Sequence, residues 1–318
     1  VTGATGFIGS NVVDRLLKDG YKVRGTARSS KAAQLQKNYA SHGNKFEVTI
    51  IDDITTSDFT DAVEGVDAII HVASPFGGAT TEQSLKGAID GTSRILTAGY
   101  IAGVKKFVVT ASLISILGMQ QLREDRVFTE KDYNWVSYES ATKPDATPSD
   151  VYATAKSLAE KAAWDFAMTH RDVDLTTIHP STHRSSTAPP VAARLLRDPL
   201  CNGTNGFVYT LIDPKAERGR TPPPVGLTTA FVNVLDVARG HVLALKTPPA
   251  QERKRIILNG GNFTWAEATK YLHAVRPELA DRLPVVDDSA DDETKGIMFS
   301  RFDTSAAERL LGLRDYIG

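Results

Sequence analysis

The chain of 318 residues lacks the features of several protein classes. Its single cysteine, Cys201, excludes a disulfide within the chain, which fits a reducing compartment such as the cytoplasm. No apolar run approaches the ~20 residues that a membrane-spanning helix needs, and no signal peptide is visible. Neither sign of charge dominates, because 37 Lys and Arg stand against 38 Asp and Glu. We therefore expect neither a membrane nor nucleic acid as a partner.

Short apolar runs alternate with helical patterns through the first 178 residues. Val1-Thr2 resembles the last step of a strand, so we expect most of a first strand to lie upstream of Val1. This alternation predicts an α/β fold with a parallel, doubly wound (Rossmann) sheet. The expected strands are 21–26, 46–52, 67–73, 107–110, 175–178 and 255–258, and the main expected helices are 31–39, 81–102, 150–169, 234–246 and 264–275.

Prolines break this rhythm after about residue 180, at Pro189-Pro190 and again at Pro222-Pro223-Pro224. Such a change predicts a second, smaller α/β lobe that binds the substrate and is partly interleaved with the first. The expected division is a dinucleotide-binding Rossmann domain of residues 1–178 and 229–258, and a substrate lobe of residues 179–228 and 259–318.

The chain opens on a glycine turn, Gly3-Ala4-Thr5-Gly6-Phe7-Ile8-Gly9, between a strand and a helix. Glycines at this spacing permit a tight turn, bring the backbone close to a pyrophosphate and let helix and strand pack closely. The helix N-terminus then offers free N–H groups to the phosphates. A turn with no ligand is the alternative, but the strand and helix on either side favour dinucleotide binding.

The choice of cofactor depends on the end of the second strand, where an NAD site places an acidic residue. No Asp or Glu occurs between Asp19 and Glu47, whereas Arg28 and Lys31 follow this strand. A guanidinium suits a ribose 2′-phosphate, so we expect NADPH/NADP+. Asp53-Ile54 follows the third strand and either borders the adenine or caps a turn.

A second pattern predicts carbonyl chemistry. Tyr152 and Lys156 lie four residues apart on the same face of an expected helix. A nearby ammonium lowers the pKa of a phenol and makes it a usable general acid. The spacing alone is common by chance, but Ser112 follows an expected strand and would place a hydroxyl at the same edge of the sheet.

These residues stand in stretches that resemble the extended short-chain dehydrogenase/reductase superfamily. The chain looks most like its branch of dihydroflavonol reductases, cinnamoyl-CoA reductases and fungal methylglyoxal/aldehyde reductases. It departs from that pattern at residues 181–186, after Pro180. The matching stretches are VTGATGFIGS (1–10), VRGTARSS (23–30), DAIIHVASPF (67–76), FVVTAS (107–112), YATAKSLAEKAAWDF (152–166), LTTIHP (175–180), NVLDVARGHVLAL (233–245) and ILNGGNFTW (257–265).

The resemblance implies a role for each matching residue. Ser112 would bind the carbonyl oxygen, Tyr152 would donate the proton, and Lys156 would hold the nicotinamide ribose. Arg28 would bind the 2′-phosphate. Residues along the cofactor would further include Ala73, Ser74, Pro75, Thr110 and Pro180, and candidates for the substrate pocket wall are Phe76, Leu113 and Trp135.

We therefore expect an NADPH-dependent reductase that converts an aldehyde or ketone into an alcohol, acting as a monomer or homodimer on a small-molecule substrate. The alternatives are a nucleotide-sugar epimerase or dehydratase, a hydroxysteroid-type dehydrogenase, and a non-catalytic NADP-sensing protein. His179 and His183 do not form a convincing metal pair, because Pro180 lies between them and no carboxylate or cysteine cluster accompanies them. We expect both to be loop histidines and expect no metal.

Overall fold

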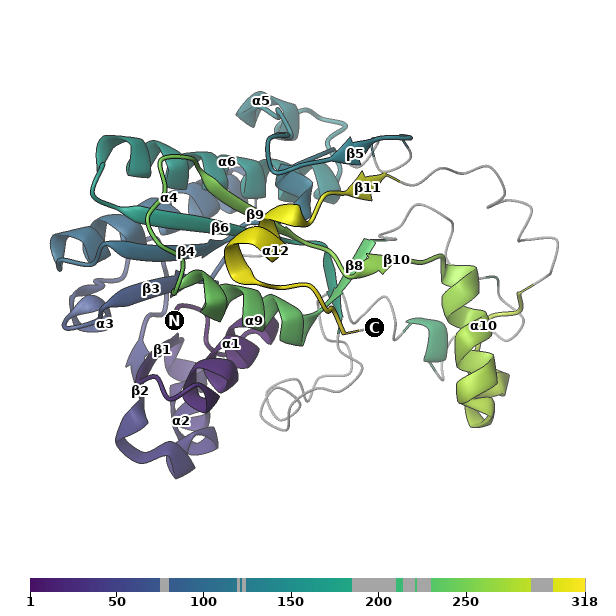
Figure 1. The fold of residues 1–318 in the computed structure, drawn as a ribbon, viewed down its shortest axis with the longest axis horizontal. Helices are drawn as coiled ribbons and strands as arrows, with labels where there is room; N and C mark the ends of the chain where they lie inside the picture. The colour runs from purple at the N-terminus through teal and green to yellow at the C-terminus, as the bar shows by residue number, and fades with distance from the viewer. Residues whose placement is uncertain are drawn as a thin grey trace.

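A computed structural model of the chain describes residues 1–74, 80–118, 121, 124–184, 210–213, 221, 230–286 and 300–317. Its main strands are parallel (Figure 1). They are β1 (Val23–Ala27), β2 (Phe46–Ile50), β3 (Ala68–His71), β4 (Lys106–Thr110), β6 (Asp174–Pro180) and β9 (Lys254–Leu258).

Val1 and Thr2 join the two groups of paired strands, β1-β2 and β3-β4-β6-β9. The amide of Thr2 donates to the carbonyl of Ile70 at 3.0 Å, and the amide of Thr26 donates to the carbonyl of Val1 at 2.9 Å. The order across the sheet is therefore β2, β1, Val1-Thr2, β3, β4, β6 and β9. The predicted parallel Rossmann sheet is confirmed.

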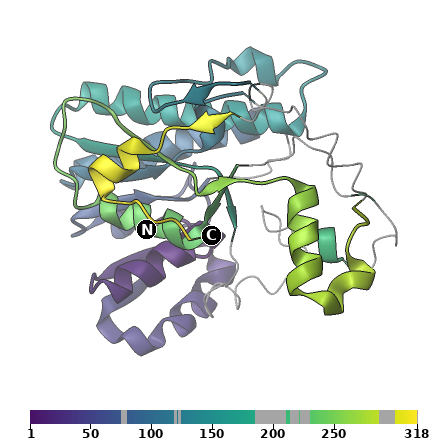
Figure 2. The same cartoon turned by 45° about the vertical axis from the view of Figure 1, so that its right-hand side comes forward.

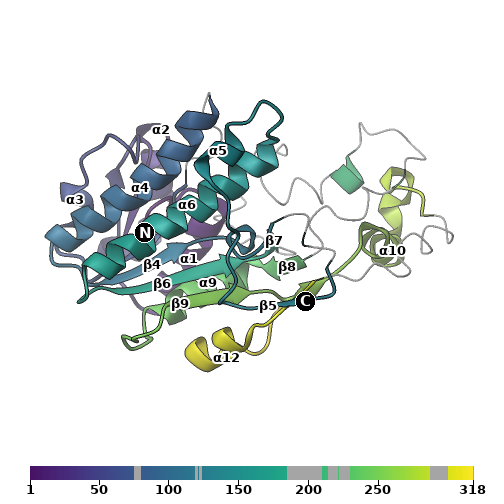
Figure 3. The same ribbon diagram turned by 90° about the horizontal axis from the view of Figure 1, so that it is seen from above.

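Helices cover both faces of this sheet (Figure 3). One face carries α1 (Phe7–Lys18) and α9 (Val234–Ala244), and the other carries α4 (Thr81–Ile101) and α6 (Pro148–Thr169). The remaining elements of this part are α2 (Ser29–Asn38), α3 (Thr60–Val63), α5 (Tyr138–Ala141) and the 3-10 turns η1 (Ala40–Lys45) and η2 (Leu113–Ser115). In the part of the chain that the structure describes, every helix is too short or too polar to span a lipid bilayer.

Alternate residues of the central strands supply two separate cores. Phe107 and Val109 of β4 pack with Ile95 and Leu96 of α4, whereas Val108, between them, belongs to the core of α1 and α9. Successive side chains of a strand point to opposite faces, so an apolar strand buried on both sides fills both cores.

A smaller region continues beyond the carboxyl end of β6. The strand β7 (Thr182–Arg184) pairs with β8 (Ala230–Asn233), which also pairs with β10 (Gly261–Asn262). Figure 2 shows α10 (Trp265–Val275) standing apart from the main sheet beyond β10. The other described elements here are β5 (Val127–Phe128), β11 (Arg301–Phe302) and the 3-10 turn η4 (Pro277–Arg282).

The C-terminal helix α12 (Ser305–Leu311) corrects the predicted division of the chain. Ala307, Leu311 and Leu313 are buried in the core that α1 and α9 share, and the amide of Ile317 donates to Asp236 at 2.7 Å. The assignment of all of residues 259–318 to the substrate lobe was wrong for this segment, because its apolar face covers α9 and β9. The remaining lobe boundaries stay a prediction.

Candidate functional site

The glycine turn has a geometry that side chains would destroy. Gly3 has a φ of +67°, and a Cβ on Gly9 would lie 2.1 Å from the carbonyl oxygen of Gly3. Gly6 is the N-cap of α1, and neither a side-chain cap nor an acidic residue occupies the first turn of that helix. Half-buried Thr5, Phe7 and Ile8 complete the turn. This arrangement fits a pyrophosphate at the helix N-terminus.

Thr2 fastens the turn to the end of β3, a role that the sequence did not indicate. Its hydroxyl accepts from the amides of Val72 and Ala73, both at 3.1 Å, so its own hydrogen points to Nδ1 of His71 at 2.8 Å. The backbone of Ala73 thereby lies against Gly3. Ser74 is exposed beside it, whereas predicted residues Pro75 and Phe76 lie outside the described residues.

Arg28 stands where a 2′-phosphate site was predicted. It is exposed at the N-cap of α2, directly after β1, and exposed Lys31 follows in the first turn. Arg24 is not available there, since it donates to Glu47 and to the carbonyl of Glu64.

Asp52 is an acidic group near Arg28 that was not predicted from the sequence, because it follows the next strand, β2. Asp52 accepts from the amide of Ser29 at 2.7 Å, and this hydrogen bond, with Arg28 nearby, lowers the pKa of Asp52. Asp53 accepts from the amide and hydroxyl of Thr55, both at 2.7 Å. Asp53 thus caps a turn in this structure, while Ile54 packs on Gly91 of α4.

Ser112, Tyr152 and Lys156 meet beyond the carboxyl end of β4. A capping box of Thr147 and Asp150 fixes the start of α6, and this sets the position of Tyr152 in the second turn. The side chains of Ser112 and Tyr152 share a hydrogen bond, and Nζ of Lys156 donates to the carbonyl of Thr110 at 3.2 Å. The three residues predicted to be catalytic therefore lie together.

The pKa of Tyr152 is shifted upwards, opposite to the direction that was predicted. Burial raises it, and the hydrogen bond with Ser112 lowers it by less. Burial also lowers the pKa of Lys156 to about 8, because charge is disfavoured away from water. The predicted lowering of the Tyr152 pKa by Lys156 is thus not seen, and the phenol is held protonated near neutral pH.

Two buried neutral histidines flank this group. Nδ1 of His241 donates to the carbonyl of Val237 at 2.7 Å, so its Nε2 accepts from the hydroxyl of Thr110 at 2.7 Å. Burial and then the charge of Lys156 lower the pKa of His71 to about 3, and burial is also the main cause that lowers the pKa of His241 to about 4. Both rings are buried uncharged between the sheet and the helices, where they form hydrogen bonds with neighbouring threonines.

These histidines predict a loss of stability in mild acid. The unfolded chain takes up protons at its histidines below pH 6.5, whereas His71 and His241 stay neutral in the fold until about pH 3 and 4. Their contribution is present above pH 6.5 and is lost as the pH falls towards 4, at about 2 kcal/mol for each histidine by pH 5. Urea unfolding of His241→Gln at pH 7 and pH 5 should show a shallower decline than the wild type, while exposed His42→Gln should not. An equal decline in all three proteins would contradict this account.

His179 is not the loop histidine that was expected. It is fully buried in β6, because that strand continues to Pro180, and it contacts Glu160 of α6 at 3.2 Å. Burial alone would raise the pKa of Glu160, but the neighbouring His179 and Arg255 hold it well below its usual range. His183 lies in β7. Within the described ranges, no three His, Cys, Asp or Glu side chains are grouped as metal ligands.

The candidates for the pocket wall lie elsewhere. Leu113 is buried in a core cluster with Ile116 and Ile257. Trp135 is 85% exposed and lines a cavity of about 200 Å³ with Trp164 and Arg253, which none of Ser112, Tyr152 and Lys156 borders. The geometry gives no support to either as part of a substrate pocket.

Comparison with known proteins identifies the family of this site. Residues 1–260 match the sequence model of the NAD dependent epimerase/dehydratase family. The chain belongs to this family. The predicted resemblance to extended short-chain dehydrogenases/reductases is thereby confirmed.

Several known proteins are similar over almost the whole chain. Aldehyde reductase 2 of Sporidiobolus salmonicolor is 31% identical, with 98% of this chain and 88% of that protein covered. Ketoreductase azaE of Aspergillus niger is also 31% identical, with 98% and 91% covered. Among solved structures, Gre2 of Candida albicans in complex with NADPH is 28% identical, with a TM-score of 0.85 and with 100% of this chain and 93% of that chain covered.

Proposed function

We propose that this protein reduces an aldehyde or ketone to an alcohol with NADPH. The observation that carries this proposal is the meeting of Ser112, Tyr152 and Lys156 at the sheet edge to which the glycine turn belongs. Aldehyde reductase 2 and ketoreductase azaE, named for the same reaction type, support it. The single cysteine is compatible with work in the cytoplasm.

Each polar group of the site has a distinct task in this reaction. Gly3, Gly6, Gly9 and Arg28 would hold NADPH, which supplies a hydride when bound. The hydroxyl of Ser112 would donate a hydrogen bond to the carbonyl oxygen of the substrate. Tyr152 would give its proton to the same oxygen as negative charge develops there. Its raised pKa suits this task, since a proton donor must be protonated before the reaction.

The test is a screen of aldehydes, ketones and diketones by the loss of NADPH absorbance. We expect turnover with at least one of these classes and little turnover for Ser112→Ala. Binding of NADPH without turnover of any carbonyl would favour a sensing protein. NAD that co-purifies and is regenerated in each turnover would favour an epimerase or dehydratase.

Arg28 should set the preference for NADPH over NADH. A hydrogen bond between charged groups contributes about 1.5–3 kcal/mol, so Arg28→Ala should raise the KM for NADPH by about 10- to 100-fold and leave the KM for NADH unchanged. The matched control is Lys37→Ala, at the other end of α2. Equal use of both cofactors by the wild type would overturn this assignment.

Lys156 should produce an alkaline limb in the pH profile. Its ammonium is present below about pH 8 and is lost as the pH rises through that value. We expect kcat/KM to fall above pH 8 by about tenfold per pH unit. Lys156→Arg should be slower but should lack this limb, because a guanidinium stays charged. A limb that is unchanged in Lys156→Arg would assign it to another group.

A further inference from the structure

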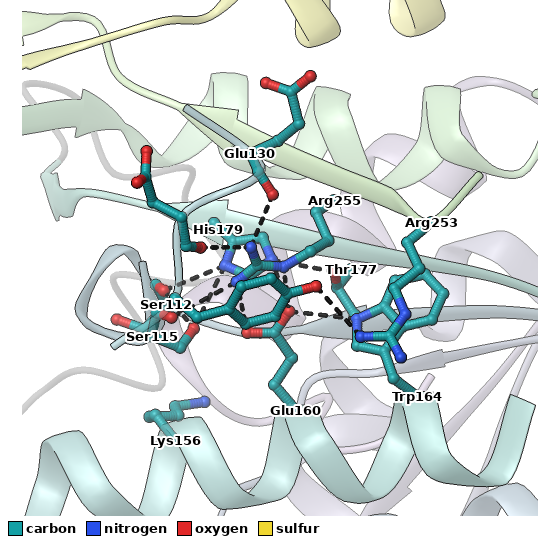
Figure 4. Close-up of polar contacts among 12 residues, drawn as sticks. Ser112, Ser115, Glu130, Lys156, Glu160, Trp164, Thr177, His179, Arg253 and Arg255 are labelled. Carbon is teal, nitrogen blue, oxygen red and sulfur yellow. Dashed lines mark hydrogen bonds and ion pairs between the residues drawn. The ribbon is translucent and has the colours of Figure 1, made fainter. Parts of the chain in front are cut away.

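A chain of buried polar groups runs from Ser112 to β9 (Figure 4). Nδ1 of His179 lies 3.2 Å from the carbonyl oxygen of Ser112 and 3.3 Å from Oγ of Ser115. On the other side of the ring, Nε2 lies 3.2 Å from Oε1 of Glu160. Arg255 then binds both oxygens of Glu160, at 2.6 and 3.1 Å. His179, Glu160 and Arg255 are exposed by 0%, 3% and 1%, so this chain is closed to water.

The ring of His179 has a defined orientation. A backbone carbonyl can only accept, so Nδ1 carries the hydrogen that is donated to Ser112. Nε2 faces both Glu160 and the hydroxyl of Thr177, which lies 2.9 Å away. The ring therefore has polar partners on both sides and cannot turn over without losing them.

Arg255 holds the other end of this series of buried polar groups. Besides Glu160, its guanidinium donates to the carbonyls of Glu130 and Asp132 at 2.7 and 2.6 Å, and it lies over the ring of Tyr133 at 3.8 Å. Nε1 of Trp164 also donates to Glu160, at 3.2 Å. Arg255 and Trp164 thus hold the carboxylate that faces His179.

At its first member, this series of polar groups fixes the main chain of Ser112. Its carbonyl accepts from three donors, namely the amide of Ser115 at 3.0 Å, the hydroxyl of Ser115 at 2.7 Å and His179. Two of these donors belong to the same 3-10 turn and move with it. Among the described residues, His179 is the only donor to this carbonyl that belongs to the sheet.

Through Glu160, the same series of polar groups includes the helix that carries Tyr152. Glu160 follows Lys156 by four residues and Tyr152 by eight, so these three positions lie along one side of α6. We propose that His179 is a positioning residue that, held by Glu160 and Arg255, aims Ser112 at the substrate oxygen in register with Tyr152. This inference rests on the proposed carbonyl reduction.

The experiment compares two substitutions of His179. An asparagine amide can replace the donor at Nδ1, whereas leucine removes it. We expect His179→Leu to lower kcat by about 10- to 100-fold, because small misplacements of reacting groups are this costly, and to leave the Kd for NADPH unchanged. His179→Asn should stay within about threefold of the wild type. The matched control is Thr176→Val in the same strand, since Thr176 is equally buried and its hydroxyl has no partner among the described residues.

A double-mutant cycle separates positioning from mere folding. If His179 acts through Ser112, His179→Leu should cost little more activity once Ser112→Ala has been introduced. Losses that multiply in the double variant, or His179→Asn as slow as His179→Leu, would overturn the positioning role alone. A wild type that reduces no carbonyl would overturn the proposed function and this inference with it.

Discussion

Tyr152→Phe should lower kcat/KM for carbonyl reduction by about 10²- to 10⁴-fold, the range typical of a lost general acid. The substitution removes one oxygen and keeps the ring, so the start of α6 should fold unchanged. The phenol is the group best placed to give a proton, because its pKa is raised by burial and its hydroxyl shares a hydrogen bond with Ser112. Steady-state rates with NADPH and the best carbonyl of the screen would measure the effect.

Two measurements make this result specific to the chemical step. The Kd for NADPH, measured by fluorescence titration, should change little in Tyr152→Phe. Tyr100→Phe is the matched control, since Tyr100 lies in α4 and contacts Lys105 and His170 instead of the site. If Tyr152→Phe retained more than about a tenth of the wild-type activity, the proton would have to come from another donor.

The residues around Tyr152 differ in how well the sequence predicts them. Lys156 was predictable because a spacing of four marks neighbours on a helix, and Ser112 because parallel strands end at one edge of a sheet. The first rule uses the geometry of one helix, and the second needs only the fold class. Asp52 escaped because its partner Ser29 stands 23 residues away in sequence, on a neighbouring connection.

The buried ion pair shows the same limit more strongly. Glu160 extends the series of Tyr152 and Lys156 by another turn, and that spacing was a usable signal. Arg255 is the first residue of the expected strand 255–258, where nothing pointed to a partner, and His179 stands next to a proline, which favoured a loop. Their meeting depends on the register of β6 with β9 and on the packing of α6, and neither is encoded in a short window.

The C-terminal helix α12 shows another limit of prediction from the sequence. Ala307 and Leu311 of this helix, and Leu313 just after it, would suit any apolar surface equally well. Only the position of α9 decides that they cover the Rossmann core rather than a second lobe. Helical periodicity thus predicts which face of an element is buried, but it leaves the partner of that face open.

Arg255→Met should destabilise the fold by about 3–5 kcal/mol, as expected when one partner of a buried ion pair is removed. The substitution leaves the carboxylate of Glu160 buried without its bidentate partner, and it leaves the carbonyls of Glu130 and Asp132 without a donor. Urea unfolding at neutral pH, followed by circular dichroism, would measure the change.

The double variant Arg255→Met with Glu160→Gln distinguishes charge burial from lost packing. Removing the unpaired carboxylate should restore at least about half of the lost stability, because a neutral amide costs much less to bury than an unpaired charge. The exposed pair Lys161 and Asp165, four residues apart in the same helix, provides the control, since Lys161→Met should change the free energy of unfolding by less than about 0.5 kcal/mol. A double variant as unstable as Arg255→Met would show that the carbonyls of Glu130 and Asp132, rather than the charge of Glu160, are what Arg255 stabilises.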